Sequence, residues 1–221
     1  KMFIPNPGYV LVDADYSQIE LRVLAHIADD AVMRDAFARN LDVHTVTATQ
    51  VFGISTEEVT SLQRRHAKAV NFGIVYGISE FSLAEDIGVS RYQAKAYIES
   101  YLSNYSGVKA YMKHVVEEAR SIGYTKTIYG RRRYIPELKS SNFNVRQGAE
   151  RIALNTPIQG SAADLIKLAM IHVDKALRES YPDARLILQV HDELIVECPQ
   201  EMAEQVAQLV SAEMQQVAQL E

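Results

Sequence analysis

The sequence has a single cysteine, Cys198, so it cannot form an internal disulfide. A chain without disulfides suits a reducing cytosol. No apolar run approaches the roughly 20 residues that a membrane-spanning helix needs. The opening residues, KMFIPNPGYV, lack the apolar segment of a signal peptide. These absences predict a cytoplasmic protein without a membrane partner.

Internal repeats and low-complexity linkers are also missing. The chain has 221 residues, of which 48% are hydrophobic. That is enough for one large domain or two small ones, with a buried core. The chain begins with Lys1 rather than methionine, and its last predicted helix runs to Glu221 without a terminal cap. We therefore expect a piece of a longer protein.

The net charge of −5 argues against a nucleic-acid partner, but its distribution argues for one. Basic residues gather between positions 120 and 151, where acids are few, whereas the last 25 residues are acidic. The basic residues of this sector are Arg120, Lys126, Arg131, Arg132, Arg133, Lys139, Arg146 and Arg151. Such a sector can follow a phosphate backbone. A solvated charged face is the alternative.

The apolar pattern predicts many helices and few strands, which is typical of the α+β class. Strands are expected over 9–14 and in a hairpin over 185–198, and a small hairpin or arm over 124–138. Capping-box spacing at Ser55 and at Ser90 predicts helix starts. Further helices are expected from about 17, over 61–76, 108–121, 144–155 and 158–179, and at the C-terminus. Pro157 should separate the helices on either side of it.

The stretch LILQVHDELIVE, residues 186–197, places three ionisable residues between two apolar runs. The runs predict a hairpin with His191, Asp192 and Glu193 at its tip. Hairpin turns prefer Asn-Gly or Gly-X, so this turn is locally disfavoured. A locally disfavoured turn often has a functional reason, although a capped loop is an equal alternative.

Asp15 ends the first predicted strand, and Asp192 lies at the hairpin tip. If these strands share a sheet, both carboxylates can emerge at one end, where they would repel and need a cation. Oxygen ligands with room for water suit Mg²⁺, and two such ions ~3.5–4 Å apart promote in-line attack at phosphorus. Asp13 shares the strand face of Asp15, so spacing cannot choose between them. A helix N-cap remains the alternative for either.

Arg64, Lys68, Phe72 and Tyr76 recur every four residues and so lie along one slowly winding helix face. Two cations four residues apart repel, and a triphosphate bound between them would remove that cost. Phe72 would lie where a base or sugar can stack, with Gly73 leaving room for close approach. An ordinary surface helix with buried aromatics is the alternative, but it gives no reason for a mid-helix glycine, which costs ~1 kcal/mol.

Three segments resemble, in sequence and in order, motifs A, B and C of the family A DNA polymerases, the bacterial DNA polymerase I type. They are DYSQIELR (15–22), RRHAKAVNFGIVYG (64–77) and QVHDE (189–193). The segments DVHTVTA, GRRRYIPEL and NTPIQGSAADLIK are similar to further parts of the family, so the resemblance covers nearly the whole chain.

The resemblance implies a small antiparallel palm sheet with an inserted helical fingers subdomain. Palm would cover 1–40 and 141–221, fingers would cover 41–140, and thumb and exonuclease domains would be absent. It also implies template-directed DNA synthesis, in which a deoxynucleotide passes from a dNTP to the primer 3′-hydroxyl with release of pyrophosphate. The implied partners are primer–template DNA and dNTPs. The chain would act as part of a longer, monomeric polymerase in the bacterial cytoplasm, associated with the nucleoid.

The resemblance selects Asp15 over Asp13. Asp15 and Asp192 would ligate two Mg²⁺ ions, Tyr16 would add its backbone carbonyl, and Glu193 would be an accessory carboxylate. Arg64, Lys68 and His44 would bind the triphosphate, and Lys68 would also protonate the leaving pyrophosphate. Phe72 would pack on sugar and base, Tyr76 would guard the insertion site, and Glu20 would exclude the 2′-hydroxyl. The residues implied to contact the duplex or primer end are Arg22, Arg151, Asn155, Gln159 and His191, while Arg131 and Arg132 would contact the template backbone.

Two other functions stay open. Without its missing parts the chain could bind nucleotide or DNA without turnover. A two-metal nuclease would use the same carboxylates, but hydrolysis needs no base-stacking platform beside the two cations.

Overall fold

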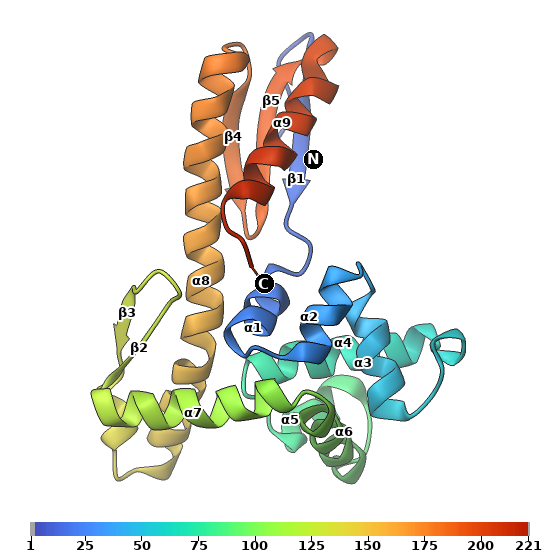
Figure 1. The fold of residues 1–221 in the computed structure, drawn as a ribbon, viewed down its shortest axis with the longest axis vertical. Helices are drawn as coiled ribbons and strands as arrows, with labels where there is room; N and C mark the ends of the chain where they lie inside the picture. Colours follow the sequence, from blue (N-terminus) through green and yellow to red (C-terminus); the bar gives the residue numbers. More distant parts are fainter. Residues whose placement is uncertain (1–2, 221) are drawn as a thin grey trace. The chain divides into compact units, whose positions relative to one another are not determined.

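The computed structural model describes residues 3–220, which divide into two compact units (Figure 1). The first unit comprises residues up to 19 and residues 162–220, and the second comprises residues 20–161. Helices outnumber strands over the described residues, and both sheets are small and antiparallel. The α+β prediction is confirmed. No helix of the described chain is long and apolar enough to cross a membrane.

The first unit is a three-stranded sheet with helices on one face. Its elements are β1 (Tyr9–Asp15), β4 (Arg185–Val190), β5 (Glu193–Pro199), the 3₁₀ turn η3 (Gln200–Met202), α9 (Ala203–Gln216) and the later part of α8 (Phe143–Ser180). The strand order is β1-β5-β4, so β5 is central (Figure 1). The predicted strand and the predicted hairpin are both present.

Strand alternation divides this sheet into a buried and an open face. Leu194, Val196 and Cys198 of β5 are fully buried in a cluster with side chains of α8 and α9. Val12 and Ala14 of β1 pack against the same cluster. The opposite face therefore carries the acidic residues of β1 and β5.

The second unit is mainly helical. Its elements are α1 (Ile19–Ile27), α2 (Ala31–Ala38), α3 (Val43–Phe52), η1 (Thr56–Glu58), α4 (Ser61–Val75), α5 (Glu80–Ile87), α6 (Arg91–Asn104), α7 (Ser106–Ile122), β2 (Tyr124–Lys126), β3 (Arg132–Tyr134), η2 (Pro136–Lys139) and the first part of α8. The small arm predicted over 124–138 is the β2–β3 hairpin followed by η2. The palm and fingers limits implied by the resemblance stay a prediction.

Side-chain caps set several helix starts, as the sequence suggested. The capping boxes at Ser55 and Ser90 are both formed, although the first opens only a 3₁₀ turn. A further box joins Thr60 to Gln63 and begins α4. Gly77, with φ +66°, follows that helix in the left-handed region that favours glycine.

The prediction that Pro157 separates two helices is wrong, because α8 runs from Phe143 to Ser180 with Pro157 inside it. A proline removes one backbone N–H from the helix. Hydroxyls next to the proline make extra bonds to the backbone: Thr156 Oγ1 donates to the Ile152 carbonyl at 2.7 Å, and the Ser161 hydroxyl donates to the Pro157 carbonyl. The other hydrogen bonds of α8 outweigh the free energy lost with the one hydrogen bond that Pro157 cannot make.

A close backbone approach joins α7 to the start of α2. The buried Asp30 carboxylate accepts from Met33 N, which caps α2, and from Gly107 N at 2.9 Å and Val108 N at 3.3 Å. A Cβ atom at Gly107 would lie 2.7 Å from the Ala28 carbonyl oxygen and 2.8 Å from Asp30 Cα. Only glycine fits this position.

We expect Gly107→Ala to destabilise the protein by about 1–3 kcal/mol, because the added methyl group overlaps backbone atoms. Gly148→Ala is the matched control, since Gly148 lies in α8 with open space around its Cα. The control should stabilise by up to ~1 kcal/mol through helix propensity. Thermal midpoints measure both changes, and equal midpoints for the two variants would contradict the packing argument.

Candidate nucleotide and metal sites

Three acidic residues lie at one end of the sheet in the first unit. Asp15 is directly opposite Glu193 in the β1–β5 register. Tyr16 N donates to the Asp192 carbonyl at 3.2 Å. The Tyr16 hydroxyl donates to the Met214 carbonyl of α9 at 2.5 Å, which anchors the chain as it leaves the strand. Residues 15 and 192, far apart in sequence, are thus neighbours.

The hairpin turn that presents Asp192 has an uncommon backbone conformation. His191 has φ +53°, in the left-handed region that non-glycine residues seldom adopt. Gln189 Nε2 donates to the His191 carbonyl at 2.6 Å and holds the turn. The conformation is imposed by the two paired strands on either side, and such imposed strain is common at functional sites.

Electrostatic repulsion is concentrated at Asp15. Partial desolvation, and then the negative charges of Asp192 and Asp13, raise the pKa of the Asp15 carboxyl, while the Tyr16 backbone N–H opposes the shift. A divalent cation would relieve this repulsion. Two carboxylates and a backbone carbonyl, completed by water, are the oxygen donors that Mg²⁺ takes. Within residues 3–220 no group of three or more His, Cys, Asp or Glu side chains is already gathered around a common metal position.

In the second unit, the predicted face of α4 exists as an ordered row. Lys68 Nζ lies 5.9 Å from the centroid of the Phe72 ring. The Phe72 and Tyr76 rings are stacked at 6.5 Å with an interplanar angle of 19°, and the His44 ring lies 5.9 Å from Phe72. Tyr76 is 40% exposed, so this is not a helix with buried aromatics.

The space beside Gly73 is filled by protein, which corrects the expectation that this glycine leaves room for a ligand. A Cβ atom at Gly73 would lie 2.7 Å from Ile78 Cγ2. Ile78 N also donates to the Gly73 carbonyl at 2.8 Å as the chain folds back after α4. The glycine therefore permits the sharp end of the helix.

Tyr76 is held by an acid from α1. Its hydroxyl donates to Glu20 Oε2 at 2.8 Å. Partial desolvation, followed by this hydrogen bond and the charge of Glu20, raises the pKa of Tyr76, whereas a hydrogen bond with Gln159 opposes the shift. Glu20, Tyr76 and Gln159 thus belong to one cluster, formed from α1, α4 and α8.

Arg151 and Asn155 of α8, which the family resemblance predicts to contact the DNA duplex, lie against the end of α4. The Asn155 amide, oriented to satisfy its neighbours, donates to the carbonyls of Arg151 and Val75. A Cβ atom at Gly77 would lie 3.2 Å from Arg151 Cγ. Since Arg151, Asn155 and Gln159 are four residues apart, they share one face of α8.

A cavity of about 320 Å³ opens beside this junction. Phe72, Tyr76 and Gly77 line it from α4 and its end, Arg151 lines it from α8, and α5 contributes Ser82 and Asp86. Two aromatic side chains and a guanidinium are groups on which a flat heterocyclic ring can stack.

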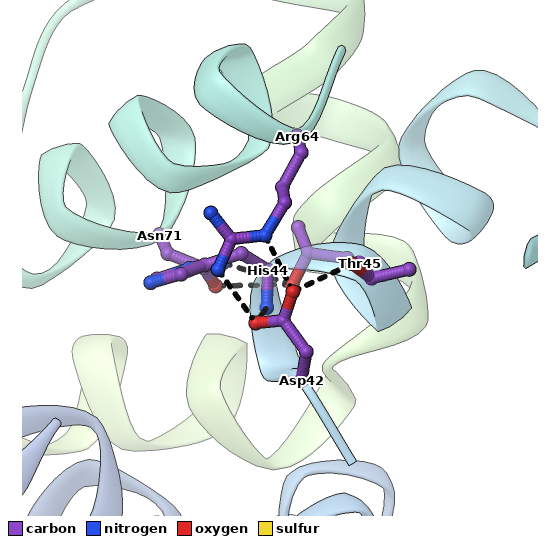
Figure 2. A network of polar contacts seen from close by, with 6 residues as sticks. Asp42, His44, Thr45, Arg64 and Asn71 are labelled. Carbon is purple, nitrogen blue, oxygen red and sulfur yellow. Dashed lines mark hydrogen bonds and ion pairs between the residues drawn. The ribbon is translucent and has the colours of Figure 1, made fainter. Parts of the chain in front are cut away.

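A carboxylate at the start of α3 was not among the predicted site residues. Asp42 binds the Arg64 guanidinium at two points, Nε to Oδ2 at 2.5 Å and Nη2 to Oδ1 at 3.1 Å (Figure 2). It also caps α3, because it accepts from His44 N at 3.3 Å and from the Thr45 hydroxyl at 2.6 Å. The spacing of Asp42 and Thr45 is typical of an N-cap and could have identified it.

A buried polar network joins α3 to α4 and to Tyr105, which lies between α6 and α7. Asn71 Nδ2 bonds His44 Nδ1 at 3.1 Å and Thr47 Oγ1 at 3.0 Å, and Thr47 Oγ1 bonds the Tyr105 hydroxyl at 2.9 Å. Burial lowers the pKa of His44 to about 4. The positive charges of Arg64 and Lys68 act in the same direction, whereas the negative charge of Asp42 opposes the shift. His44 is therefore neutral at pH 7.

Comparison with known proteins covers the whole chain. A sequence profile of DNA polymerase family A matches residues 1–221. The chain belongs to DNA polymerase family A. DNA polymerase I of Geobacillus stearothermophilus is 54% identical over 221 residues, 100% of this chain and 25% of that protein. DNA polymerase I of Bacillus subtilis is 55% identical over 211 residues, 95% of this chain and 24% of that protein.

The fold agrees with that of a solved structure. The POL domain of Pol1 from M. smegmatis, in complex with DNA primer-template and dNTP, matches with a TM-score of 0.94 at 46% identity. The match covers 99% of this chain and 39% of that one. The chain spans about a quarter of the length of the curated relatives it matches.

Four other residues are predicted from the family resemblance to contact DNA, and they lie in different parts of the fold. Arg22 lies with its guanidinium carbon 4.6 Å from the centroid of the Phe37 ring. Arg131 and Arg132 are exposed on the β2–β3 hairpin, and Arg132 stacks over Tyr124 at 4.8 Å. His191 is exposed at the hairpin tip of the first unit. Their roles stay predictions.

The low pKa of His44 predicts a pH dependence of stability. In the unfolded chain a histidine titrates near 6.5, so the unfolded state binds more protons than the folded state between pH 6.5 and about 4. The free energy of unfolding should therefore decrease as pH falls through this window, by up to ~3 kcal/mol, and stay level above it. His44→Gln should lose this decrease in thermal midpoints measured from pH 8 to pH 4. If the thermal midpoint of the variant falls between pH 6.5 and 4 as much as that of the unchanged protein, His44 is not the group responsible.

Proposed function

We propose that this chain carries the nucleotidyl-transfer site of a DNA polymerase, which extends a primer on a DNA template. The observation that carries the proposal is the face of α4, where two cations precede two stacked aromatic rings. Membership in DNA polymerase family A along the whole chain supports it. A nuclease has no need for such a face, because hydrolysis requires no stacked base.

The acidic end of the sheet is proposed to hold the metal ions. Asp15 and Asp192 would bind two Mg²⁺ ions, with the backbone carbonyl of Tyr16 as a further ligand and Glu193 as an accessory acid. When bound, the ions would lower the pKa of the primer 3′-hydroxyl and neutralise the leaving phosphates. The raised pKa of Asp15 supports this role, since a site that repels its own charge favours a cation.

The nucleotide is proposed to bind along α4. Arg64 would contact the triphosphate through its guanidinium fork, and Lys68 and His44 would contact it as point donors. As the bond from the 3′-oxygen to the α-phosphorus forms, the 3′-hydroxyl gives its proton to solvent water. The bond from that phosphorus to the pyrophosphate oxygen breaks, and Lys68 gives the leaving pyrophosphate a proton. Phe72 would pack on sugar and base. The cavity of about 320 Å³ between the end of α4 and Arg151 of α8 suits a stacked base.

The DNA duplex is proposed to contact the face of α8 that carries Arg151, Asn155 and Gln159, together with Arg22 and His191. Minor-groove acceptors are shared by A·T and T·A pairs, so contacts there can test pair geometry without reading sequence. Arg131 and Arg132 would bind the template backbone. We place the parent polymerase in the bacterial cytoplasm, at DNA, as a monomer.

The metal assignment is tested by Asp15→Asn and Asp192→Asn in the intact polymerase. Either change should lower the rate of primer extension roughly 10³-fold, because several kcal/mol of transition-state stabilisation are lost, while primer–template binding persists. Asp13→Asn is the control, since Asp13 shares the strand face but is opposite Ile195 rather than Glu193. Extension near the normal rate in Asp15→Asn would refute the assignment.

Sugar selection is tested at Glu20 and its partner Tyr76. Glu20→Ala should admit ribonucleotides, with discrimination lowered by about 10–200-fold, since it opens space for one small group. Tyr76→Phe removes the hydrogen bond that holds Glu20 and should give a smaller change in the same direction. Competition between dCTP and CTP on one template measures both. Unchanged discrimination in Glu20→Ala would remove this residue from sugar selection.

A third test concerns Phe72. Phe72→Tyr adds a hydroxyl that could replace a missing 3′-hydroxyl, so discrimination against dideoxynucleotides should fall. The ratio of dNTP to ddNTP incorporation measures it. No change would mean that Phe72 does not face the sugar.

A further inference from the structure

Arg64, the cation proposed to bind the triphosphate, is already bound by a carboxylate. Its Nε and Nη2 donate to the two oxygens of Asp42, at 2.5 Å and 3.1 Å (Figure 2). A guanidinium meets a phosphate with the same two-point geometry. Asp42 therefore occupies the Nε–Nη2 edge of the guanidinium, and a phosphate that binds at this edge has to take its place.

Asp42 is held in this position independently of Arg64. Its oxygens accept from His44 N at 3.3 Å and from Thr45 Oγ1 at 2.6 Å, both in the first turn of α3. Partial burial would raise the pKa of Asp42, but the bonds from Arg64 and Thr45 outweigh it and lower the pKa to about 2. The carboxylate is therefore an anion at any working pH.

The ion pair is accessible to an incoming anion. The side chains of Arg64 and Asp42 are 47% and 34% exposed. Phosphate oxygens can reach the fork without unfolding α3 or α4. Solvent screening keeps such a pair weak enough to be exchanged.

We propose that Asp42 is a positioning residue that holds the Arg64 fork in the absence of nucleotide and must be displaced by the triphosphate. This proposal rests on the proposed function, in which Arg64 binds the triphosphate. The exchange weakens nucleotide binding, because each binding event breaks the Asp42–Arg64 pair. It also promotes the departure of pyrophosphate, because Asp42 recaptures the fork. Asp42 thus raises the dissociation constants of both substrate and product.

The test uses Asp42→Asn in the intact polymerase, because asparagine keeps the oxygen that caps α3 but removes the charge. The dissociation constant of a dNTP is measured on a primer–template whose primer ends in a dideoxynucleotide, so that no chemistry occurs. It should fall about two- to fivefold, the range expected for an exposed ion pair. The inhibition constant of pyrophosphate in primer extension should fall in parallel, while kcat does not rise.

Removing a negative charge could also tighten binding without involving Arg64. The change is therefore repeated in an Arg64→Ala background, where the proposal expects Asp42→Asn to have no effect. An equal tightening in that background would overturn the proposal. Asp35→Asn is the charge control, because Asp35 pairs with Arg39 at 3.2 Å on the surface of the same unit, and it should leave the dNTP constant unchanged.

The outcomes separate this proposal from the proposed function. If Arg64→Ala alone leaves dNTP binding unchanged, Arg64 is not a triphosphate residue, and both ideas fail at that point. If Arg64→Ala weakens binding but Asp42→Asn weakens it too or changes nothing, only the role of Asp42 is overturned. Should Asp42→Asn lower the thermal midpoint strongly, Asp42→Ser, which keeps a preferred N-cap residue without the carboxylate, decides by the same criterion.

Discussion

The backbone ladder between β1 and β5 is the interaction on which the acidic site depends. It pairs two segments almost at opposite ends of the chain and fixes their register residue by residue, from Tyr9 opposite Pro199 to Asp15 opposite Glu193. A slip of one residue would turn every side chain to the other face of the sheet. The buried row of Leu194, Val196 and Cys198 prevents that slip, because it can face α8 and α9 in only one register. The hydrophobic core thus determines where the carboxylates lie.

The helical unit uses buried polar groups for a similar purpose. Asn71 is fully buried on α4, and its amide binds His44 and Thr47 of α3. A buried amide without partners costs free energy, so these bonds favour one relative position of the two helices. That position aligns His44 with Phe72 and brings Asp42 to Arg64. The Arg64 guanidinium of α4 is therefore held by a side chain of α3.

The first unit concentrates negative charge at the end of its sheet, and the second unit concentrates positive charge at the start of α4. At the sheet end, like charges raise the pKa of Asp15. At the start of α4, two cations of like charge lie one turn apart, and a carboxylate from α3 compensates one of them. At the sheet end an added cation would lower the energy, whereas at the start of α4 an added anion would meet Lys68 directly and would reach Arg64 only in exchange for Asp42. This is the electrostatic character expected of sites for a metal and for a polyphosphate.

The sequence by itself determined the local structure and the chemical types. Strand alternation, capping boxes and four-residue spacing located β1, the β4–β5 hairpin, and the α4 face with its two cations and two aromatics, because each depends on neighbours within a few residues. Tertiary structure decided what local patterns do not contain. Pro157 stays inside α8 because the surrounding hydrogen bonds outweigh its cost, and Gly73 serves the return of Ile78 rather than a ligand. The position of Asp15 opposite Glu193 depends on the strand register, and the pairing of Asp42 with Arg64 depends on the packing of α3 on α4. Both join residues distant in sequence, and only the folded chain brings these residues into contact.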